Sequence, residues 1–322
     1  MFTHKDIEYR SVFVVNCLEK RNLRVMNGEL MLEDVEQDKT LTKLPFQKIL
    51  ALFVIGHITI TTALIDKCRL YGIPVVVMMP NFRPVFFYSI TAEANYLLRK
   101  KQYEYPKTDL TVAKVLIENK IRNQFRLLEK TRQKTDKIVS TKEKCQSYLP
   151  IISQVEQYET LMGIEGDVAK SFFAAYFEQH DWKLRSPRTK IDPINATLDI
   201  GYTILFNYIE AFSRLFGFDP YIGVYHRLWF KRKSLICDLI EPFRCLIDSQ
   251  VRKAFNTKQC QANDFLLIKN EYVLKREKNS DYTKMFYEVL IEQKSEIFKY
   301  MRTYYRCFMG RKSAPDYPQF LI

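Results

Sequence analysis

The spacing of apolar residues changes near Thr91, and this change constrains the fold of the 322-residue chain more than any other feature. Before it, short runs of β-branched and aromatic residues are separated by turn signals such as Asn27-Gly28. After it, apolar residues recur at helical spacing, as in TVAKVLIENKIRNQFRLLEKTRQK, and no strand signal of comparable strength returns. The sequence therefore predicts an α+β protein with a small β-rich N-terminal domain, residues 1–90, and a larger all-helical domain, residues 91–322.

The N-terminal part contains eight candidate strands and one helix. The helix is expected to start after a cap at Thr61 or Thr62 and to end at Gly72, which Pro74 follows. The candidate strands are Ser11–Cys17, Leu23–Met26, Leu30–Leu32, Leu41–Leu44, Ile49–Ile55, Ile58–Ile60, Val75–Met79 and Val85–Ile90.

The last ten residues, SAPDYPQFLI, combine two prolines with an apolar end. This composition is typical of a frayed tail, here from about residue 312, or of a peptide that docks on a partner. Both interpretations place the segment outside the helical core.

The chain is strongly basic, with 50 Lys and Arg against 37 Asp and Glu and a net charge of +13. Residues 1–90 hold 11 basic and 9 acidic residues, so most of the surplus lies in the second part. Such a surplus favours a polyanion, either nucleic acid or an anionic membrane surface. The basic residues are scattered and not gathered on one amphipathic anchor, which disfavours the membrane. A predicted helix over Lys114–Lys137 carries eight of them, and its basic face either follows a DNA backbone or is simply solvated.

Targeting and redox signals are missing from the sequence. The first residues lack the apolar core of a secretory signal, and no run approaches the length of a membrane span. We therefore expect a soluble, cytoplasmic protein. The seven scattered cysteines form no CxxC pair and predict neither a disulfide framework nor a zinc knuckle.

Two acids interrupt the apolar segment LICDLIEPFRCLID. Asp238 and Glu241 are three residues apart, so on a helix their carboxylates project from one face. Pro242 predicts a kink there, or a helix whose regular part starts near Glu241.

Glu165 and His226 are the other candidate ligands. Glu165 is expected near the start of a helix, where an acid also stabilises the macrodipole, and His226 precedes the basic run Lys231–Lys233. Together with Glu241 they offer two carboxylates and one imidazole, a set that suits Mg²⁺ or Mn²⁺ bound to a phosphodiester. The alternative is a core histidine with two ordinary salt-bridged acids.

Three ordered segments resemble the universal integrase subunit of CRISPR adaptation. They are LMGIEGDVAKSFFAAYF, RTKIDPINATLDIGYTILFNYIEA and GVYHRLWFKRKSLICDLIEPFRCLID, within Leu161–Asp248. The resemblance implies an enzyme that joins the 3′-hydroxyl ends of short double-stranded DNA fragments to the CRISPR repeat by metal-dependent transesterification, with associated endonuclease activity.

The resemblance also assigns roles to residues. It implies that Glu165, His226 and Glu241 bind Mg²⁺ or Mn²⁺, and it matches Asp238 to an acid that holds the metal shell, binds the ion or assists a proton transfer. Asp192 and Asn195, at a predicted helix start, are expected to brace the site. Candidate DNA contacts are Arg188, Lys190, Lys231, Arg232, Lys233 and Arg244, of which Arg244 could equally orient Glu241.

The family resemblance further implies a homodimer, paired through the β-rich domain, and a small ferredoxin-like partner protein. Two alternatives remain open from the sequence. One is a structure-selective DNA nuclease that only hydrolyses, and the other is a non-catalytic DNA-binding scaffold whose acids are structural.

Overall fold

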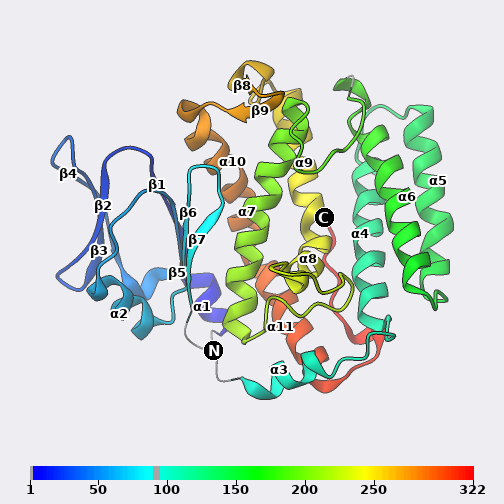
Figure 1. Cartoon of the computed structure of the whole chain (residues 1–322), viewed down its shortest axis with the longest axis horizontal. Coiled ribbons are helices and arrows are strands. Elements are labelled where there is room, and N and C mark those ends of the chain that lie inside the picture. Colours follow the sequence, from blue (N-terminus) through cyan, green and yellow to red (C-terminus); the bar gives the residue numbers. More distant parts are fainter. Residues whose placement is uncertain (1–2, 90–94, 181) are drawn as a thin grey trace.

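The computed structural model describes residues 3–89, 95–180 and 182–322, and it has the predicted α+β composition (Figure 1). Seven strands lie in the N-terminal part, and helices make up most of the remainder. The strands are β1 Ser11–Cys17, β2 Arg21–Met26, β3 Glu29–Asp34, β4 Lys39–Pro45, β5 Ile49–Gly56, β6 Val75–Met78, β7 Pro84–Tyr88, β8 Phe265–Ile268 and β9 Glu271–Leu274. The helices are α1 His4–Tyr9, α2 Thr62–Tyr71, α3 Tyr96–Tyr103, α4 Thr111–Glu129, α5 Asp136–Ile152, α6 Tyr158–Tyr176, α7 Pro193–Phe216, α8 Ser234–Ile240, α9 Arg244–Asn256, α10 Asn279–Glu292 and α11 Lys294–Gly310.

The N-terminal strands form two sheets. Four strands pair in the order β1-β5-β6-β7, and β2-β3-β4 form an antiparallel sheet. Strand β5 is buried along its whole length because its parallel neighbours β1 and β6 cover its edges and both of its faces are packed. On one face, Val54 packs with β3 and α2, and on the other Phe53 stacks on Tyr208 of α7 with 5.8 Å between ring centroids.

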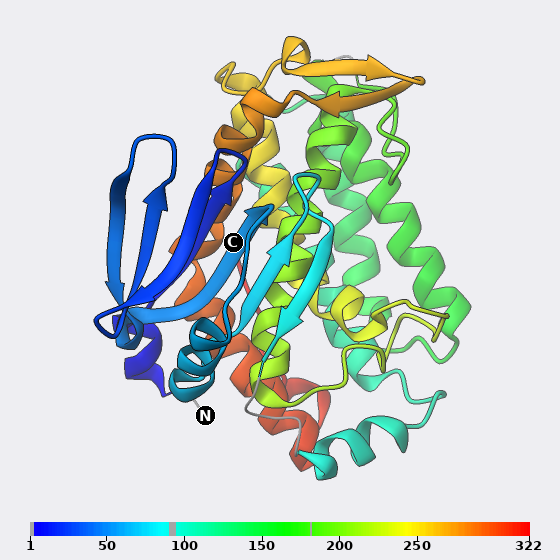
Figure 2. The same cartoon turned by 60° about the vertical axis from the view of Figure 1, so that its left-hand side comes forward.

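One hydrophobic core joins the four-stranded sheet to the helices. Phe53 also contacts Tyr287 of α10 at 5.2 Å, so α7 and α10 both cover the sheet (Figure 2). The predicted boundary between residues 90 and 91 lies outside the described residues. The four-stranded sheet is not a separate packing unit, since half of its buried apolar side chains belong to the core of the helical part.

Several local predictions are confirmed. Thr61 caps α2 and Gly72 ends it in the left-handed conformation with φ 66°, while Asn27-Gly28 joins β2 to β3. Asp192 caps α7 by accepting a hydrogen bond from the Asn195 N–H at 2.7 Å, with Pro193 at the first helical position. No helix in the described part of the chain is long and apolar enough to cross a membrane.

Three secondary-structure predictions are wrong. The second part is not all-helical, because β8 and β9 form a hairpin whose two loop residues, Lys269 and Asn270, have φ of 51° and 65°. The run Ile58–Ile60 is not a strand, and α1 was not expected. The basic stretch Lys114–Lys137 is not one helix, since α4 ends at Glu129 and α5 begins at Asp136.

The C-terminal segment is neither frayed nor free for a partner, which corrects both predictions. Phe320 is buried against Phe243, with 4.9 Å between ring centroids. Its backbone is bound by two asparagines of α4: Asn119 donates to the Phe320 carbonyl at 2.6 Å and accepts from its N–H at 2.9 Å, and Asn123 donates to the same carbonyl at 2.8 Å. The segment therefore belongs to the core around α4.

Candidate active site

The three predicted metal ligands come from three different elements of the helical part. Glu165 lies in the middle of α6 and not at its start, so the macrodipole does not explain this acid. His226 lies in the connection between α7 and α8. Glu241 opens a single 3-10 turn, Glu241–Phe243, between α8 and α9, where Pro242 produces the predicted interruption of the helix.

The two glutamates meet at one cation, which is the ammonium of Lys120. Its Nζ donates a hydrogen bond to Glu165 Oε1 and lies 2.8 Å from Glu241 Oε2. Among the described residues, no three His, Cys, Asp or Glu side chains are arranged to hold a metal, and this includes Glu165, His226 and Glu241. In this structure the ammonium of α4 therefore occupies the space between the carboxylates.

The charge around Glu241 is balanced by cations. Burial by itself raises the pKa of this carboxyl, but Arg244 and Lys120 outweigh burial and lower its pKa to about 2. Arg244 Nε lies 2.9 Å from Glu241 Oε2. The pKa of Lys120 rises despite its burial, because Glu165 and Glu241 stabilise its charged form. The site is thus built to hold the buried carboxylate of Glu241 ionised inside the protein.

His226 is oriented by Asp238. Its Nδ1 lies 2.7 Å from Asp238 Oδ1, which also accepts the His226 backbone N–H at 2.8 Å. The other oxygen, Oδ2, accepts the backbone N–H groups of Val224 at 2.6 Å and Tyr225 at 3.1 Å. With Nδ1 held in this way, the Nε2 nitrogen is the one left to bind a ligand.

Gly223 allows this arrangement. A Cβ atom at this position would lie 2.5 Å from Asp238 Oδ2 and 2.8 Å from the Ser234 carbonyl carbon. Asp238 is completely buried and all its bonds go to the 224–226 segment. Its geometry is that of a positioning residue for His226, the first of the three roles that the sequence left open.

Tyr202 and Asp248 support Arg244 on the side away from Glu241. Its guanidinium lies over the ring of Tyr202, 4.7 Å from the centroid, and the Tyr202 hydroxyl donates to Asp248. Burial raises the pKa of the Asp248 carboxyl to about 6. Asn195 is also buried and accepts from Arg185 at 2.8 Å, which agrees with its predicted bracing role.

The residues present fit a hard divalent cation. Glu241 Oε2 is buried and has no hydrogen bond with a described residue, although two cations pair with it. An ion that bound there would replace the Lys120 ammonium between the same two oxygens. Two carboxylates and one imidazole form a donor set for Mg²⁺ or Mn²⁺.

The six predicted DNA contacts differ in their surroundings. Lys233 pairs with buried Glu210 at 2.6 Å and Arg244 pairs with Glu241, so both cations are already engaged. Lys190 pairs with Glu271 at 3.7 Å, and Arg188 is exposed. Lys231 and Arg232 form no ion pair with a described residue and lie on the loop after His226.

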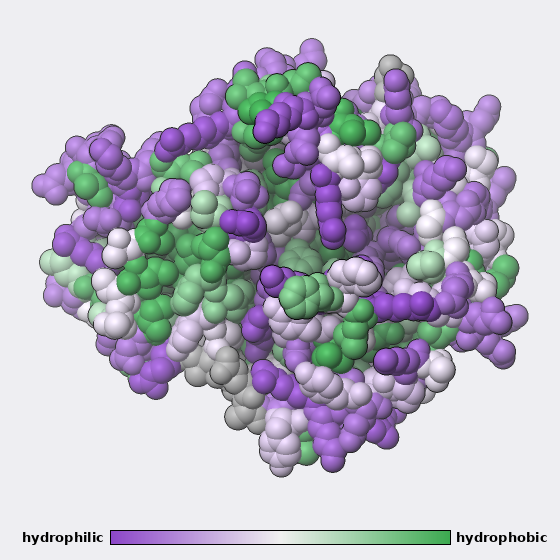
Figure 3. All heavy atoms as spheres, in the orientation of Figure 1, coloured by the Kyte–Doolittle hydropathy of each residue, from purple (hydrophilic) through white to green (hydrophobic). Residues whose placement is uncertain are grey.

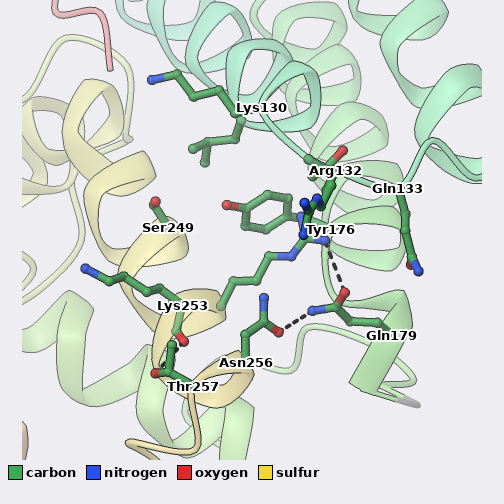
Figure 4. A pocket seen from close by; sticks show the side chains of 12 residues that line it. Lys130, Arg132, Gln133, Tyr176, Gln179, Ser249, Lys253, Asn256 and Thr257 are labelled. Atoms are coloured by element: carbon green, nitrogen blue, oxygen red, sulfur yellow. Dashed lines mark hydrogen bonds between the residues drawn. The ribbon is translucent and has the colours of Figure 1, made fainter.

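A basic pocket lies at the far end of the same helices (Figure 4). It encloses about 550 Å³ between the ends of α4, α6 and α9, and its lining includes Lys130, Arg132, Arg252 and Lys253 but no acidic residue. Lys130 follows Lys120 by ten residues, about 15 Å along the helix direction. In Figure 4 the Lys253 side chain extends along the pocket, and Gln179 and Asn256 are hydrogen bonded to each other.

Sequence reasoning placed Lys120 on a solvated or DNA-binding face and so missed its position. Its neighbours give the only local signal: Ile117, Ile121, Asn119 and Asn123 are buried around it, so this turn of α4 faces inward. A lysine on an inward-facing turn requires an acidic partner, and Glu165 and Glu241 are its partners.

The chain is similar to known proteins over most of its length. Residues 17–288 match the sequence profile of the family described as CRISPR associated protein Cas1. The chain is 29% identical over 270 residues to a CRISPR-associated endonuclease Cas1 of Thermodesulfovibrio yellowstonii, covering 80% of this chain and 84% of that one. It is 32% identical over 190 residues to one of Leptospira interrogans, covering 53% and 73%.

Solved structures show the same fold. A Cas1 protein from Thermotoga maritima superposes with a TM-score of 0.75 at 19% identity, covering 92% of this chain and 97% of that one. A casposase bound to an integration product gives a TM-score of 0.75 at 18% identity, covering 97% and 96%. Because the family profile matches most of its length, this chain belongs to the Cas1 family of CRISPR-associated proteins.

Proposed function

We propose that this chain is the metal-dependent DNA integrase of a CRISPR adaptation system, with an associated endonuclease activity. The observation that carries the proposal is the meeting of Glu165 and Glu241 at one cation position. Beside them, a histidine is oriented through its Nδ1 by a buried aspartate. The names of its relatives, CRISPR-associated endonucleases, and a structural neighbour bound to an integration product support the same activity.

In the proposed reaction, the 3′-hydroxyl of a short DNA fragment attacks a phosphodiester of the repeat. A new phosphodiester forms, the bridging P–O bond on the opposite side breaks, and the displaced strand leaves with a 3′-hydroxyl. Glu165, Glu241 and the Nε2 atom of His226 would hold Mg²⁺ or Mn²⁺. When bound, this ion supplies charge neutralisation at the phosphate and lowers the pKa of a coordinated hydroxyl.

The chain's own cations and positioning groups complete the site. Arg244 keeps Glu241 ionised. Asp238 holds the imidazole of His226 in place through the hydrogen bond at Nδ1. The basic pocket lined by Lys130 and Lys253 would bind phosphates of the DNA backbone away from the reacting bond.

The proposed partners are double-stranded DNA, a second copy of this chain and a small ferredoxin-like protein. A structural neighbour is part of a Cas6-RT-Cas1–Cas2 complex, which supports a partner of the Cas2 kind. Apolar side chains gather over the N-terminal strands on the face shown in Figure 3, and edge strand β7 exposes Val85 and Phe86. We place the pairing of two copies at this part of the chain.

The deciding experiment measures the joining of a labelled short DNA duplex to a supercoiled plasmid that carries the repeat. The small partner protein is present, and the reaction is run with and without Mn²⁺. Joining is expected with the unmodified chain, and loss of at least a hundredfold is expected for Glu165→Ala. Asp167→Ala is the matched control, because Asp167 lies on the same helix and pairs with Lys144 instead of Lys120.

The outcomes separate the candidate functions. Metal-dependent cleavage without a joined product would show that the chain is a nuclease that only hydrolyses DNA. If the chain binds DNA but neither cuts nor joins it, and Glu165→Ala does not change the binding, the chain is a non-catalytic scaffold.

A further inference from the structure

Tyr225, the residue before His226, carries a buried hydroxyl without a partner. The side chain is 4% exposed, and its Oη atom forms no hydrogen bond with any described residue. Leaving a buried polar group unpaired costs free energy, so most such groups in proteins are hydrogen bonded. An unpaired hydroxyl next to a candidate metal ligand therefore calls for a physical explanation.

The Tyr225 ring packs between the two helices that carry Lys120 and Glu165. It belongs to a core cluster with residues of α4 and α6, among them Ile121 and Ile164. Ile121 is the residue after Lys120, and Ile164 is the residue before Glu165. The ring therefore lies among the side chains that flank this ion pair.

Contacts on several sides hold the ring in place. Its centroid lies 5.6 Å from that of Tyr158 on α6 and 5.1 Å from that of His226. The Tyr225 backbone N–H donates to Asp238 Oδ2 at 3.1 Å, within the same group of bonds that orients His226. The hydroxyl is thus fixed inside the protein together with the segment that carries the histidine.

The charge of Glu165 acts on this hydroxyl. Burial raises the pKa of Tyr225, and of the charged groups around it Glu165 raises that pKa most. The hydroxyl therefore keeps its proton and is a neutral hydrogen-bond donor in the field of the Glu165 carboxylate.

Glu165 depends on Lys120 for its hydrogen bonding. Its Oε1 atom accepts from the Lys120 ammonium, and its Oε2 atom has no hydrogen bond with a described residue. In the proposed metal-bound state the ammonium no longer holds this carboxylate. Carboxylates that bind metals are usually hydrogen bonded to a neighbouring group, which orients them. Tyr225 offers an unpaired donor of the kind that Glu165 then lacks.

We propose that Tyr225 is a positioning residue for Glu165, whose carboxylate accepts a hydrogen bond from the Tyr225 hydroxyl once Lys120 has given way. No proton is transferred, because the hydroxyl donates as a neutral group. The inference rests on the proposed function in taking a divalent cation as the ligand of the site. It makes the unpaired hydroxyl a cost of the metal-free protein that the metal-bound protein removes.

Tyr225→Phe removes this oxygen and keeps the ring, so its effect should differ between the two states. In the metal-free protein it deletes an unpaired polar atom, and stability should not fall. In the metal-bound protein it deletes a hydrogen bond to a ligand. A tyrosine with a purely structural role would show no such difference between the states.

Tyr287→Phe is the matched control. The Tyr287 hydroxyl is also buried and also lacks a hydrogen bond with any described residue. Its ring contacts Phe53, where α10 covers the sheet. Burial and Tyr208, but no carboxylate, raise the pKa of this hydroxyl. The control therefore deletes the same kind of atom away from the candidate metal site.

The experiment titrates the unmodified chain and both variants with Mn²⁺ alone in a calorimeter, after dialysis against EDTA and then against metal-free buffer. Tyr225→Phe is expected to weaken Mn²⁺ binding about tenfold, as when the hydrogen-bond partner of a metal ligand is removed. Tyr287→Phe should bind Mn²⁺ within about twofold of the unmodified chain. In EDTA, the thermal unfolding midpoints of both variants are expected to equal or exceed that of the unmodified chain.

Two results would overturn the role of Tyr225 and leave the metal site standing. One is equal Mn²⁺ affinity of Tyr225→Phe and Tyr287→Phe. The other is a lower midpoint in EDTA for Tyr225→Phe alone, because the hydroxyl would then already have a partner in the metal-free protein. If the unmodified chain does not bind Mn²⁺, the proposed metal site itself is wrong, and the role of Tyr225 falls with it.

Discussion

Lys120 decides the electrostatics of the candidate active site. Its ammonium contacts both Glu165 and Glu241, and with Arg244 it keeps a buried carboxylate ionised. A divalent cation bound as proposed would compete with this ammonium for the same two oxygens. The lysine would thus stabilise the metal-free protein and oppose metal binding.

We predict that Lys120→Met destabilises the protein in EDTA by about 3 kcal/mol, because buried Glu241 and partly exposed Glu165 lose their shared cation. The same change is expected to tighten Mn²⁺ binding about tenfold or more, since no ammonium must be displaced. Chemical denaturation and calorimetric titration with Mn²⁺ measure the two effects.

Lys114→Met on the same helix is the control for this change, since Lys114 bonds only to the Ser153 carbonyl. Weaker Mn²⁺ binding by Lys120→Met than by the control would show that the lysine supports the metal site instead of competing with it.

For single residues, the sequence identifies the acids of the site better than it identifies the residues that contact them. Asp238 and Glu241 were recognisable because two acids interrupt an apolar segment at helical spacing. Lys120 was not, because its partners lie 45 and 121 residues away and no local pattern encodes such a contact. The role of Asp238 stayed open for the same reason, since it depends on three backbone N–H groups of another segment.

Among the elements, the C-terminal segment has the closest connection to the site. Its backbone bonds to Asn119 and Asn123, the residues on either side of Lys120 on the inward face of α4. Asn123 also donates to the Pro242 carbonyl at 2.9 Å, next to Glu241. The segment therefore ties together the two elements that carry Lys120 and Glu241.

We predict that Phe320→Ala lowers the free energy of unfolding by about 3 kcal/mol, the cost of emptying a buried aromatic site. Phe320 is 6% exposed, whereas its neighbour Leu321 is 48% exposed, so Leu321→Ala should change stability by no more than about 0.5 kcal/mol. Urea denaturation of both variants measures this difference, and equal effects would contradict the packing described here.

Element predictions failed where local signals were weak. The hairpin β8–β9 has short strands and a Lys-Asn turn in place of Asn-Gly, and it lies between helices, so its apolar run suited a helix equally well. The proline-containing C-terminal segment resembles a free tail in composition. Its docking depends on contacts with residues far away in the sequence, among them Phe243 and the asparagines of α4 about 200 residues earlier.

For the whole molecule, the sequence predicted two domains because the period of apolar residues changes once. The structure joins them through one core, in which Phe53 of the sheet contacts Tyr208 and Tyr287 of the helices. Periodicity reports the type of element and not which faces pack together, so the sequence could not predict this continuity.

We predict that Phe53→Ala, a change in the sheet, lowers the stability of the helical part by about 3–5 kcal/mol. The measurement is urea unfolding followed by the emission of Trp182, which lies in the helical part, in a Trp229→Phe background. An unchanged midpoint for Trp182, with a separate transition of the sheet in circular dichroism, would mean that the two parts unfold independently.

The docked C-terminal segment also has a consequence for the order of folding. Residues 317–322 complete the hydrogen bonds of the helix that carries Lys120, although about two hundred residues separate the two in the sequence. Until this contact forms, α4 and the turn at Glu241 lack the segment that joins them. Because contacts between residues so far apart in sequence require the closure of a long loop, we expect the candidate site to be among the last parts of the molecule to become rigid.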